Sequence, residues 1–473
     1  MSEHFDVVVI GAGPGGYVAA LKAGQLGAKT AIVEKHYLGG TCLNYGCIPS
    51  KALLSSAELI HQIGESEKWG VKVAGGVSFD WPAIQMRKDK VISGLRGGIG
   101  ALLKGRKVTA FAGTAKLDGP GKVAIALENG EKHTITADNV ILATGSSPIR
   151  IPGWPTDAQY VCTSDEAVHW QDLPKKLLII GGGVIGCEFA CMCREFGVEV
   201  AIVEMLPALL GVMDLDLGSG LLNVFKKRGI TCHLDTKVQA MTVDNGIVKS
   251  VLSNGATLQT DRVLVATGRK PNTKDLGLET VGIAAGPRGF IAVDEFMRTA
   301  VKGYYCIGDA NGKCLLAHAA SAHGVVAVEN ALGHKKPFHA PVPAAVYTFP
   351  EIAAVGLSEE EAREQQLPIS IGRFALSSLG KAMATNHTEG FVKVIRHRET
   401  DELLGVHMMG HNATECIAAA GALMHTRASV NEFSEVVFAH PTIGESLKEA
   451  AEDALGAGLH MAPRKLIKVA IGA

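Results

Sequence analysis

The feature that most constrains the fold is a strand–glycine turn–helix–strand pattern that the chain carries twice. The first copy begins with the β-branched run FDVVVI at residues 5–10, continues through the turn GAGPGG, and ends with the strand KTAIVE. The second copy spans residues 176–204, KLLIIGGGVIGCEFACMCREFGVEVAIVE. Short apolar runs of this kind are typical of buried parallel strands, so each copy predicts a βαβ unit.

The two copies carry the same residue types at the same spacing. Each has three glycines and a glutamate that follows the first glycine by 23 positions: Gly11, Gly13, Gly16 and Glu34, then Gly181, Gly183, Gly186 and Glu204. In such a unit the glycines permit a tight turn, close approach to a pyrophosphate at the helix N-terminus, and helix–strand packing. The glutamate accepts hydrogen bonds from a ribose.

A strand that ends in Ala-Thr-Gly follows each unit downstream, VILATG ending at Gly145 and VLVATG ending at Gly268. The alternative, that one copy is a structural relic, is disfavoured because the second copy keeps every element. The sequence therefore predicts an internal duplication with two dinucleotide sites in one chain.

The residues around the second site indicate which dinucleotide it binds. A carboxylate at Glu204 bonds a ribose 2′-OH and repels a 2′-phosphate, and the following VEMLPALL contains no Arg or Lys, so we predict NAD. Further along, VKGYYCIGDA predicts a strand that runs into Asp309, which is placed to hold the polyol portion of FAD. The alternative for Asp309 is an ordinary turn, since Gly and Asp are common in turns.

Bulk composition excludes several classes of protein. At 473 residues the chain is long enough for about three domains. The formal charge of −1 gives no case for binding nucleic acid or an anionic membrane. The N-terminus MSEHFDVVVIGAG resembles no export signal, and no run of about 18–20 apolar residues is present.

A pair of cysteines, Cys42 and Cys47, lies in GGTCLNYGCIPSK. A metal site needs further ligands at similar spacing, and only Cys191 and Cys193 offer one, on a helix already claimed by the second unit; we therefore predict no metal. Two passive core cysteines are the alternative. Lys51 lies one helical turn after Cys47, and a nearby ammonium favours the reactive thiolate, so redox activity is the preferred interpretation.

The C-terminal stretch FAHPTIGESLKEAAEDALGAG supports two interpretations. In the first, Thr442 and Glu445 form a capping box that opens an amphipathic helix ending near Gly456. In the second, Glu445 orients His440 as a proton carrier for a thiol substrate. The residues alone leave these two interpretations even, and Glu445 is able to serve both.

Taken together, these motifs resemble the dihydrolipoamide dehydrogenase branch of the pyridine nucleotide–disulfide oxidoreductase family. The likeness covers nearly the whole chain, from VVVIGAGPGGYVAA through GGTCLNYGCIPSKALL, GGGVIGCEFA, ATGRKPN, IGDA and YTFPEIAAVG to AHPTIGESLKEAA. Relatives that reduce glutathione carry a second Lys where Ser50 stands. Two departures are Tyr45, where many members have Val, and LLAHAASAHG around Ala317, which lacks the usual Lys and acidic run.

The resemblance assigns roles by position. It implies that Cys42 exchanges with the dithiol substrate, that Cys47 forms the thiolate against the flavin, and that Lys51 pairs with Glu188 near the flavin. His440 and Glu445 would serve the active site of the second subunit of a homodimer. The resemblance also implies the set of cofactor-binding residues. It consists of the two glycine sets together with Glu34, Lys51, Gly145, Glu204, Gly268, Asp309 and Ala317.

The implied fold is α/β, with two Rossmann-like dinucleotide-binding domains and an α+β C-terminal dimerisation domain. The expected boundaries are 1–149 for the first part of the FAD domain, 150–274 for the NAD domain, 275–345 for a central domain that completes the FAD site, and 346–473 for the interface.

The implied reaction oxidises protein-bound dihydrolipoyl groups through the Cys42–Cys47 disulfide and FAD and delivers hydride to NAD⁺. Expected partners are lipoyl domains of 2-oxoacid dehydrogenase or glycine cleavage complexes, in a bacterial cytoplasm or, alternatively, a mitochondrial matrix. Two rival hypotheses are an NADPH-linked disulfide reductase, against which Glu204 and Ser50 speak, and a flavin-bearing structural subunit whose cysteine pair is incidental.

Overall fold

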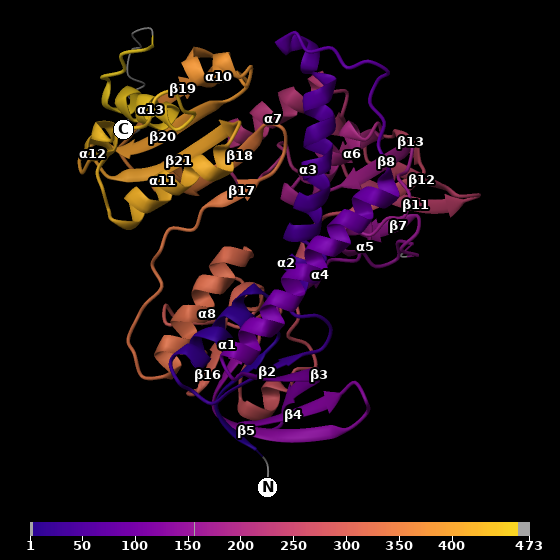
Figure 1. Ribbon diagram of the computed structural model, residues 1–473, viewed down its shortest axis with the longest axis vertical. Helices are drawn as coiled ribbons and strands as arrows, with labels where there is room; N and C mark the ends of the chain where they lie inside the picture. Colours follow the sequence, from indigo (N-terminus) through magenta and orange to yellow (C-terminus); the bar gives the residue numbers. More distant parts are fainter. Residues whose placement is uncertain (1–2, 156, 462–473) are drawn as a thin grey trace.

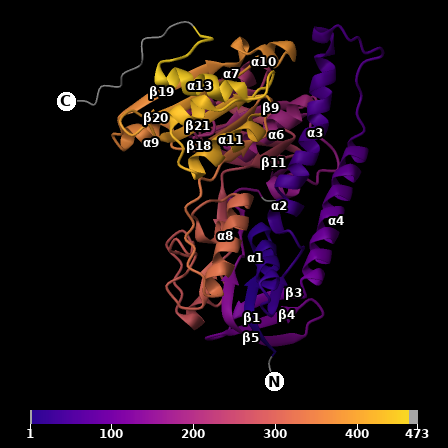
Figure 2. The same cartoon turned by 60° about the vertical axis from the view of Figure 1, so that its left-hand side comes forward.

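The computed structural model describes residues 3–155 and 157–461. Figures 1 and 2 show three regions: a first region that contains the N-terminus, a second region that contains helix α6, and a C-terminal sheet covered by helices. No helix among the described residues is long and apolar enough to cross a membrane.

The first region is built on a mixed sheet. Its strands are β1 (His4–Ile10), β2 (Thr30–Glu34), β3 (Thr109–Leu117), β4 (Lys122–Leu127), β5 (Lys132–Leu142) and β16 (Tyr304–Cys306). Strand β1 pairs in parallel with β2 and β5, and β16 pairs in parallel with β5. The predicted strand that leads into Asp309 is thus confirmed, and it joins the sheet of the first βαβ unit.

Helices α1 (Pro14–Gln25) and α8 (Ala317–Ala331) pack together beside this sheet (Figures 1 and 2). A Cβ on Gly324 would lie 2.5 Å from the carbonyl oxygen of Gly15, so only glycine permits this approach of the two helices. Three more helices lead from the first region to the second: α2 (Gly40–Asn44), α3 (Cys47–Gly64) and α4 (Trp81–Gly105). The short η1 (Ser66–Trp69) follows α3.

The second region repeats the parallel βαβ design. Its sheet has the order β10 (Thr231–His233), β9 (Glu199–Val203), β8 (Lys176–Ile180), β14 (Arg262–Val265), β7 (Val161–Thr163), all parallel. Its helices are α5 (Ser164–Ala167), α6 (Val184–Glu195) and α7 (Leu215–Lys227), and an antiparallel meander adds β11 (Val238–Asp244), β12 (Ile247–Leu252) and β13 (Thr257–Thr260). A ribbon of β6 (Ser146–Pro148) and β15 (Arg269–Pro271) joins the two regions.

The C-terminal region is an antiparallel sheet with the order β17 (Ala344–Val346), β18 (Glu351–Gly356), β21 (Leu403–Gly410), β20 (Phe391–His397), β19 (Ile369–Ala375). Helix α11 (Ala413–His425) contacts β18 and β21, and α13 (Glu445–Leu455) contacts β19 and β20. The shorter helices are α9 (Glu359–Glu364), α10 (Gly380–Ala384) and α12 (Val430–Glu435). The predicted fold class is confirmed. The domain boundaries stay a prediction, and residues 462–473 of the expected interface segment lie outside the described residues.

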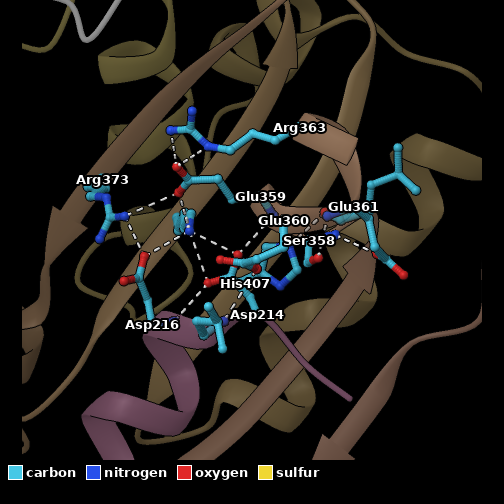
Figure 3. A network of polar contacts seen from close by, with 12 residues as sticks. Asp214, Asp216, Ser358, Glu359, Glu360, Glu361, Arg363, Arg373 and His407 are labelled. Atoms are coloured by element: carbon cyan, nitrogen blue, oxygen red, sulfur yellow. Dashed lines mark hydrogen bonds and ion pairs between the residues drawn. The ribbon is translucent and has the colours of Figure 1, made fainter. Parts of the chain in front are cut away.

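A buried ionic network fastens the second region to the C-terminal sheet (Figure 3). Lys393 on β20 has a side chain that is 0% exposed, and its Nζ lies 2.9 Å from Asp214 Oδ2, 2.8 Å from Asp216 Oδ2 and 2.6 Å from Glu359 Oε2. Asp214 also caps α7, where it accepts a hydrogen bond from the Asp216 N–H. The start of α7 is therefore fixed against the C-terminal sheet by charges removed from water.

Candidate active site

The first glycine turn has the shape that a pyrophosphate site requires. Gly11 adopts φ +100°, and a Cβ there would lie 2.4 Å from the carbonyl oxygen of Ala143. A Cβ on Gly16 would lie 1.9 Å from the carbonyl oxygen of Gly11, so no larger residue fits at the start of α1. By contrast, a Cβ on Gly13 would meet nothing within 4 Å. The turn is thus tight on its protein side and open at the helix N-terminus, where backbone N–H groups attract an anion.

The second turn matches the first residue by residue. Gly181 has φ +110°, and a Cβ there would lie 2.4 Å from the carbonyl oxygen of Ala266. A Cβ on Gly186 would lie 2.0 Å from the carbonyl oxygen of Gly181, whereas a Cβ on Gly183 would meet nothing within 4 Å. Helix α6 follows, as α1 follows the first turn. The duplication inferred from sequence therefore extends to the backbone conformation.

The two acidic residues also occupy equivalent positions. Glu34 accepts hydrogen bonds from the N–H of Ala12 at 2.7 Å and of His36 at 2.9 Å. Glu204 lies directly after β9 and accepts from Gly182 N–H at 2.6 Å and Leu206 N–H at 2.8 Å. Each carboxylate oxygen keeps further acceptor capacity, because a carboxylate has about four lone-pair sites.

The Ala-Thr-Gly segments meet where the two regions join. Gly145 (φ +67°) and Gly268 (φ +127°) directly precede β6 and β15, which pair with each other. Asp309 reaches the same place from the turn η3 (Gly308–Asn311): Ser146 Oγ donates to Asp309 Oδ2 at 2.5 Å and accepts from Arg269 Nε at 2.7 Å.

Ala317 is the first residue of α8 and lies on the same side of the sheet as the first glycine turn. A Cβ on Gly15 would lie 2.8 Å from Ala320 O, one turn further along α8. Asp309 and Ala317 are therefore brought to the first nucleotide unit from about 300 positions away in sequence, as expected for one continuous site.

The start of the helix that carries Cys42 packs directly against the first turn. A Cβ on Gly40 would lie 2.6 Å from the Cα of Gly13. Cys42 lies in α2 and Cys47 is the first residue of α3, so Lys51 follows Cys47 by one turn of the same helix. A thiol at a helix N-terminus loses its proton more readily than an ordinary thiol.

The two thiols differ in acidity. A hydrogen bond from Cys42, assisted by the Lys51 ammonium, outweighs burial and lowers the pKa of Cys47 to about 7. The same hydrogen bond, together with burial, raises the pKa of Cys42 above its usual range. Elsewhere burial raises the pKa of buried thiols, to about 12 for Cys191. In the reduced pair the thiolate therefore forms on Cys47.

Lys51 and Glu188, which are 137 positions apart, form a close ion pair. Lys51 Nζ lies 2.9 Å from Glu188 Oε1 and 2.7 Å from Oε2, and the Glu188 side chain is only 6% exposed. Glu188 belongs to α6 of the second unit. Tyr347 of the C-terminal region completes the cluster, with its N–H 3.1 Å from Glu188 Oε1 and its ring 4.5 Å from Lys51 Nζ.

His440 and Glu445 also lie together. His440 Nδ1 is 2.8 Å from Glu445 Oε1, while Glu445 Oε2 accepts from the Thr442 N–H at 2.8 Å. Only half of the capping box forms: the bond from the Thr442 N–H to Glu445 is present, but the Thr442 hydroxyl donates to Ala439 O, and α13 begins at Glu445 itself with Gly444 as N-cap. The helix ends at Leu455 before Gly456, as predicted. Glu445 therefore holds the loop and the imidazole at once.

Comparison with known proteins identifies the family. Residues 5–324 match the pyridine nucleotide-disulphide oxidoreductase family, and residues 342–451 match the dimerisation domain of these enzymes. The chain belongs to the pyridine nucleotide–disulfide oxidoreductases. It is 40% identical to the dihydrolipoyl dehydrogenase of Chlamydia trachomatis, over 98% of this chain and 100% of the relative. It is also 40% identical to the mitochondrial dihydrolipoyl dehydrogenase of Dictyostelium discoideum, over 97% and 96%.

The solved structures include a similar protein. The crystal structure of LpdA from Mycobacterium tuberculosis superimposes with a TM-score of 0.88 at 29% identity, covering 94% of this chain and 99% of that one. As a pyridine nucleotide–disulfide oxidoreductase of this type, the protein uses FAD and NAD and forms a homodimer.

The residues of this family member fit FAD at the first unit. Gly13 leaves space at the N-terminus of α1, and the Thr144 hydroxyl is buried with no hydrogen-bond partner among the described residues. A buried hydroxyl without a partner is costly, so a bound group that bonds it is expected there. The two dinucleotide sites also carry all the glycines and glutamates that the sequence predicted, although the roles of individual residues stay predictions.

His440 is far from the cysteine pair of its own chain. Its side chain is 78% exposed. It lies between α12 and α13, which Figure 1 draws well to the left of α2. A homodimer resolves the separation if the partner supplies this residue.

Sequence reasoning missed two residues of the site. Arg269 and Tyr347 contact Ser146 and Glu188, and both lie inside motifs quoted for the family resemblance, ATGRKPN and YTFPEIAAVG. Their roles depend on contacts across more than 100 positions, for which the local sequence gives no signal. Among the described residues, no cluster of three or more His, Cys, Asp or Glu side chains is arranged to hold a metal ion.

Proposed function

We propose that this protein is a dihydrolipoyl dehydrogenase, which reoxidises dihydrolipoyl groups through a Cys42–Cys47 disulfide and delivers the reducing equivalents to NAD⁺. The observation that carries the proposal is a low-pKa thiol, Cys47, which begins α3 and is hydrogen-bonded to Cys42, in a segment whose first residue, Gly40, packs against the first dinucleotide turn. Full-length similarity to dihydrolipoyl dehydrogenases supports the substrate class. When bound, FAD supplies the two-electron carrier between the cysteine pair and NAD⁺.

The protein's own residues exchange the disulfide. The partner subunit's His440 takes a proton from one substrate thiol, and the resulting thiolate attacks Cys42 Sγ. The Cys42–Cys47 bond breaks, a mixed disulfide forms on Cys42, and Cys47 leaves as a thiolate that Lys51 stabilises. The second substrate thiol then attacks the substrate sulfur that is bonded to Cys42. This step releases oxidised lipoyl, and the proton of the second thiol passes to Cys42, which leaves as a thiol.

Glu445 prepares His440 for this proton transfer. Because Glu445 accepts from Nδ1–H, the imidazole presents Nε2 with a free lone pair. A neutral imidazole in this tautomer is able to take a proton at Nε2 as a general base. The same carboxylate stabilises the imidazolium that forms once the proton has moved.

The wider assignments are part of the same proposal. Glu204 would select NAD over NADP, because a carboxylate repels a 2′-phosphate. Lipoyl-bearing subunits of 2-oxoacid dehydrogenase or glycine cleavage complexes would be the partners. We assign the protein to a bacterial cytoplasm, and similarity to a mitochondrial relative keeps the matrix as the alternative.

A steady-state assay tests the proposal. The purified holoenzyme is given dihydrolipoamide with NAD⁺ or NADP⁺, and oxidised glutathione with NADH or NADPH. Rapid NAD⁺-dependent oxidation of dihydrolipoamide, abolished in Cys47→Ser and strongly reduced in His440→Ala, is expected. Turnover of glutathione with NADPH instead would show that the substrate is a low-molecular-weight disulfide, and unchanged activity in Cys47→Ser would make the cysteine pair incidental.

A further inference from the structure

The segment between the two cysteines is held from outside by a second set of residues. Asn44, the last residue of α2, is 2% exposed. Its amide nitrogen donates to the carbonyls of Leu38 at 3.1 Å and Gly40 at 2.8 Å, and its Oδ1 accepts from Arg96 Nη2 at 2.6 Å. The side chain of Asn44 is therefore fully engaged with the loop before the cysteines and with α4.

The backbone carbonyl of Asn44 lies at the C-terminal end of α2. Carbonyls in the last turn of a helix have no partner within the helix and need one elsewhere. The Nε2 of His169, which follows α5, is 3.3 Å from this oxygen. The His169 ring also meets the Tyr45 ring edge-on, with centroids 5.8 Å apart at 79°.

A buried lysine determines which form of His169 is present. Lys88 on α4 is 1% exposed, and its Nζ is 2.7 Å from Gln85 Oε1, 3.0 Å from Val168 O and 3.0 Å from His169 Nδ1. An ammonium donates three hydrogen bonds and accepts none. His169 Nδ1 must therefore accept, which leaves the ring hydrogen on Nε2, where it donates to Asn44.

Burial and a neighbouring charge both disfavour the protonated form of this ring. Burial, followed by the Lys88 ammonium, lowers the pKa of His169, although the Asn44 carbonyl and Asp89 act in the opposite direction. Asp89 Oδ1 lies 3.0 Å from Lys88 Nζ on the exposed side of α4. The direction of this shift and the contact with Lys88 both favour a neutral His169 with its hydrogen on Nε2.

We propose that His169, oriented by Lys88, is a positioning residue for the redox-active segment: it holds the Asn44 carbonyl and thereby the placement of Cys42 relative to Cys47. The inference rests on the proposed function for the identity of the dithiol substrate, whereas the contacts around Asn44 stand independently of it. It assigns to α4 and to the segment after α5 a part in disulfide exchange that acts through the Asn44 carbonyl.

Two substitutions at His169 separate positioning from packing. His169→Phe keeps an aromatic ring beside Tyr45 and removes the donor. His169→Gln places an amide nitrogen near the position of Nε2 and an oxygen that faces Lys88, so it restores both bonds. Lys88→Met tests the orienting cation, and Lys90→Met, an exposed lysine two positions along α4, is its control.

Three measurements on the FAD-loaded protein carry the test: kcat with dihydrolipoamide, kcat with NADH and ferricyanide, which bypasses the cysteine pair, and the pH dependence of Cys47 alkylation in the reduced protein. We expect His169→Phe to lower kcat for dihydrolipoamide about tenfold, equivalent to about 1.4 kcal/mol. The ferricyanide rate should be unchanged and the alkylation midpoint should move upward. His169→Gln and Lys90→Met should match the wild type, and Lys88→Met should follow His169→Phe.

Other outcomes overturn the proposal. Equal loss in the Phe and Gln variants, or parallel loss of the ferricyanide rate, would mean that His169 serves packing alone. If Lys88→Met behaves like the wild type in all three measurements, Lys88 does not orient His169. If the wild-type protein does not oxidise dihydrolipoamide, the proposed function fails, yet the alkylation midpoints of the variants still decide the role of His169.

Discussion

The buried Lys393 network gives a quantitative prediction for the substitution Lys393→Met. The substitution keeps the volume and removes the cation. Asp216 and Glu359 retain arginine partners, Arg373 and Arg363. The hydrogen bonds that Asp214 keeps come from the N–H groups of Asp216 and Glu359, at 3.1 and 3.0 Å, and the His407 ring stays nearby. Leaving one charge of a buried pair without its partner costs about 3–5 kcal/mol.

The assay is thermal unfolding of the holoenzyme. At about 2–4 °C per kcal/mol, Lys393→Met should lower Tm by roughly 6–20 °C. Lys227→Met is the matched control, because Lys227 also joins α7 to the C-terminal region, through Glu389 at 3.4 Å, but both side chains are exposed. An exposed pair contributes about 0–1 kcal/mol, so this control should shift Tm by a few degrees at most. The double variant Lys393→Met/Asp214→Asn should recover most of the loss.

The pH dependence supplies an independent check. Burial acts to raise the pKa of Asp214, but the His407 ring and the Lys393 ammonium outweigh it, so the pKa lies below its usual range. A lowered pKa contributes stability above the unfolded value of about 3.9 and loses it as pH falls. Lys393→Met removes the part of that contribution that Lys393 supplies, so the Tm difference between variant and wild type should shrink below about pH 4. A variant within about 2 °C of wild type at pH 7, or a double variant no better than the single one, would refute the reasoning.

Three further predictions concern the site. Mixed dimers of Cys47→Ser and His440→Ala subunits should have one intact site and about half the wild-type kcat per dimer, whereas no recovery would place both residues of a site in one chain. In the reduced protein, alkylation of Cys47 should rise through a midpoint near its pKa of about 7, because the thiolate reacts and dominates above the pKa. Lys51→Met should move that midpoint upward, since the cation that favours the thiolate is lost; an unmoved midpoint would exclude Lys51 as a cause. Glu204→Ala should lower kcat/KM for NAD⁺ about tenfold and raise it for NADP⁺, because charge-assisted hydrogen bonds to the ribose are lost together with the repulsion of a 2′-phosphate. Steady-state kinetics with both nucleotides measures this change, and an unchanged ratio of the two kcat/KM values would contradict the role given to Glu204.

Local chemistry explains what could be predicted from sequence. The glycine turns, Glu34, Glu204 and the helix start at Cys47 follow from short-range steric and capping requirements, which a few adjacent residues specify. The pairing of Lys51 with Glu188 came from family resemblance, since the two lie 137 positions apart. The capping box at Thr442 and Glu445 is only half formed, because the Thr442 hydroxyl donates to the Ala439 carbonyl inside the loop that holds His440.

Other features could not be predicted because they depend on packing between distant elements. In the sequence Lys393 alternates with apolar residues of a strand, as an ordinary polar strand residue does. Nothing near it in sequence indicates its three carboxylate partners. Lys88 and His169 likewise belong to a helix and a connecting segment that meet only in the folded chain. Tertiary contact decides their environment and so their protonation.

The late position of β16 has a consequence for synthesis on the ribosome. Residues 304–306 pair with residues 140–142 of β5, so the first sheet lacks an edge strand until the second region has been made. At about 5–20 residues per second, the roughly 160 intervening positions take about 8–32 s to translate. During that interval the exposed edge of β5 is open to pairing with other chains. The nascent polypeptide is therefore most vulnerable to misassembly after its first nucleotide-binding motif has emerged, and a chaperone that shields this edge would matter most in that window.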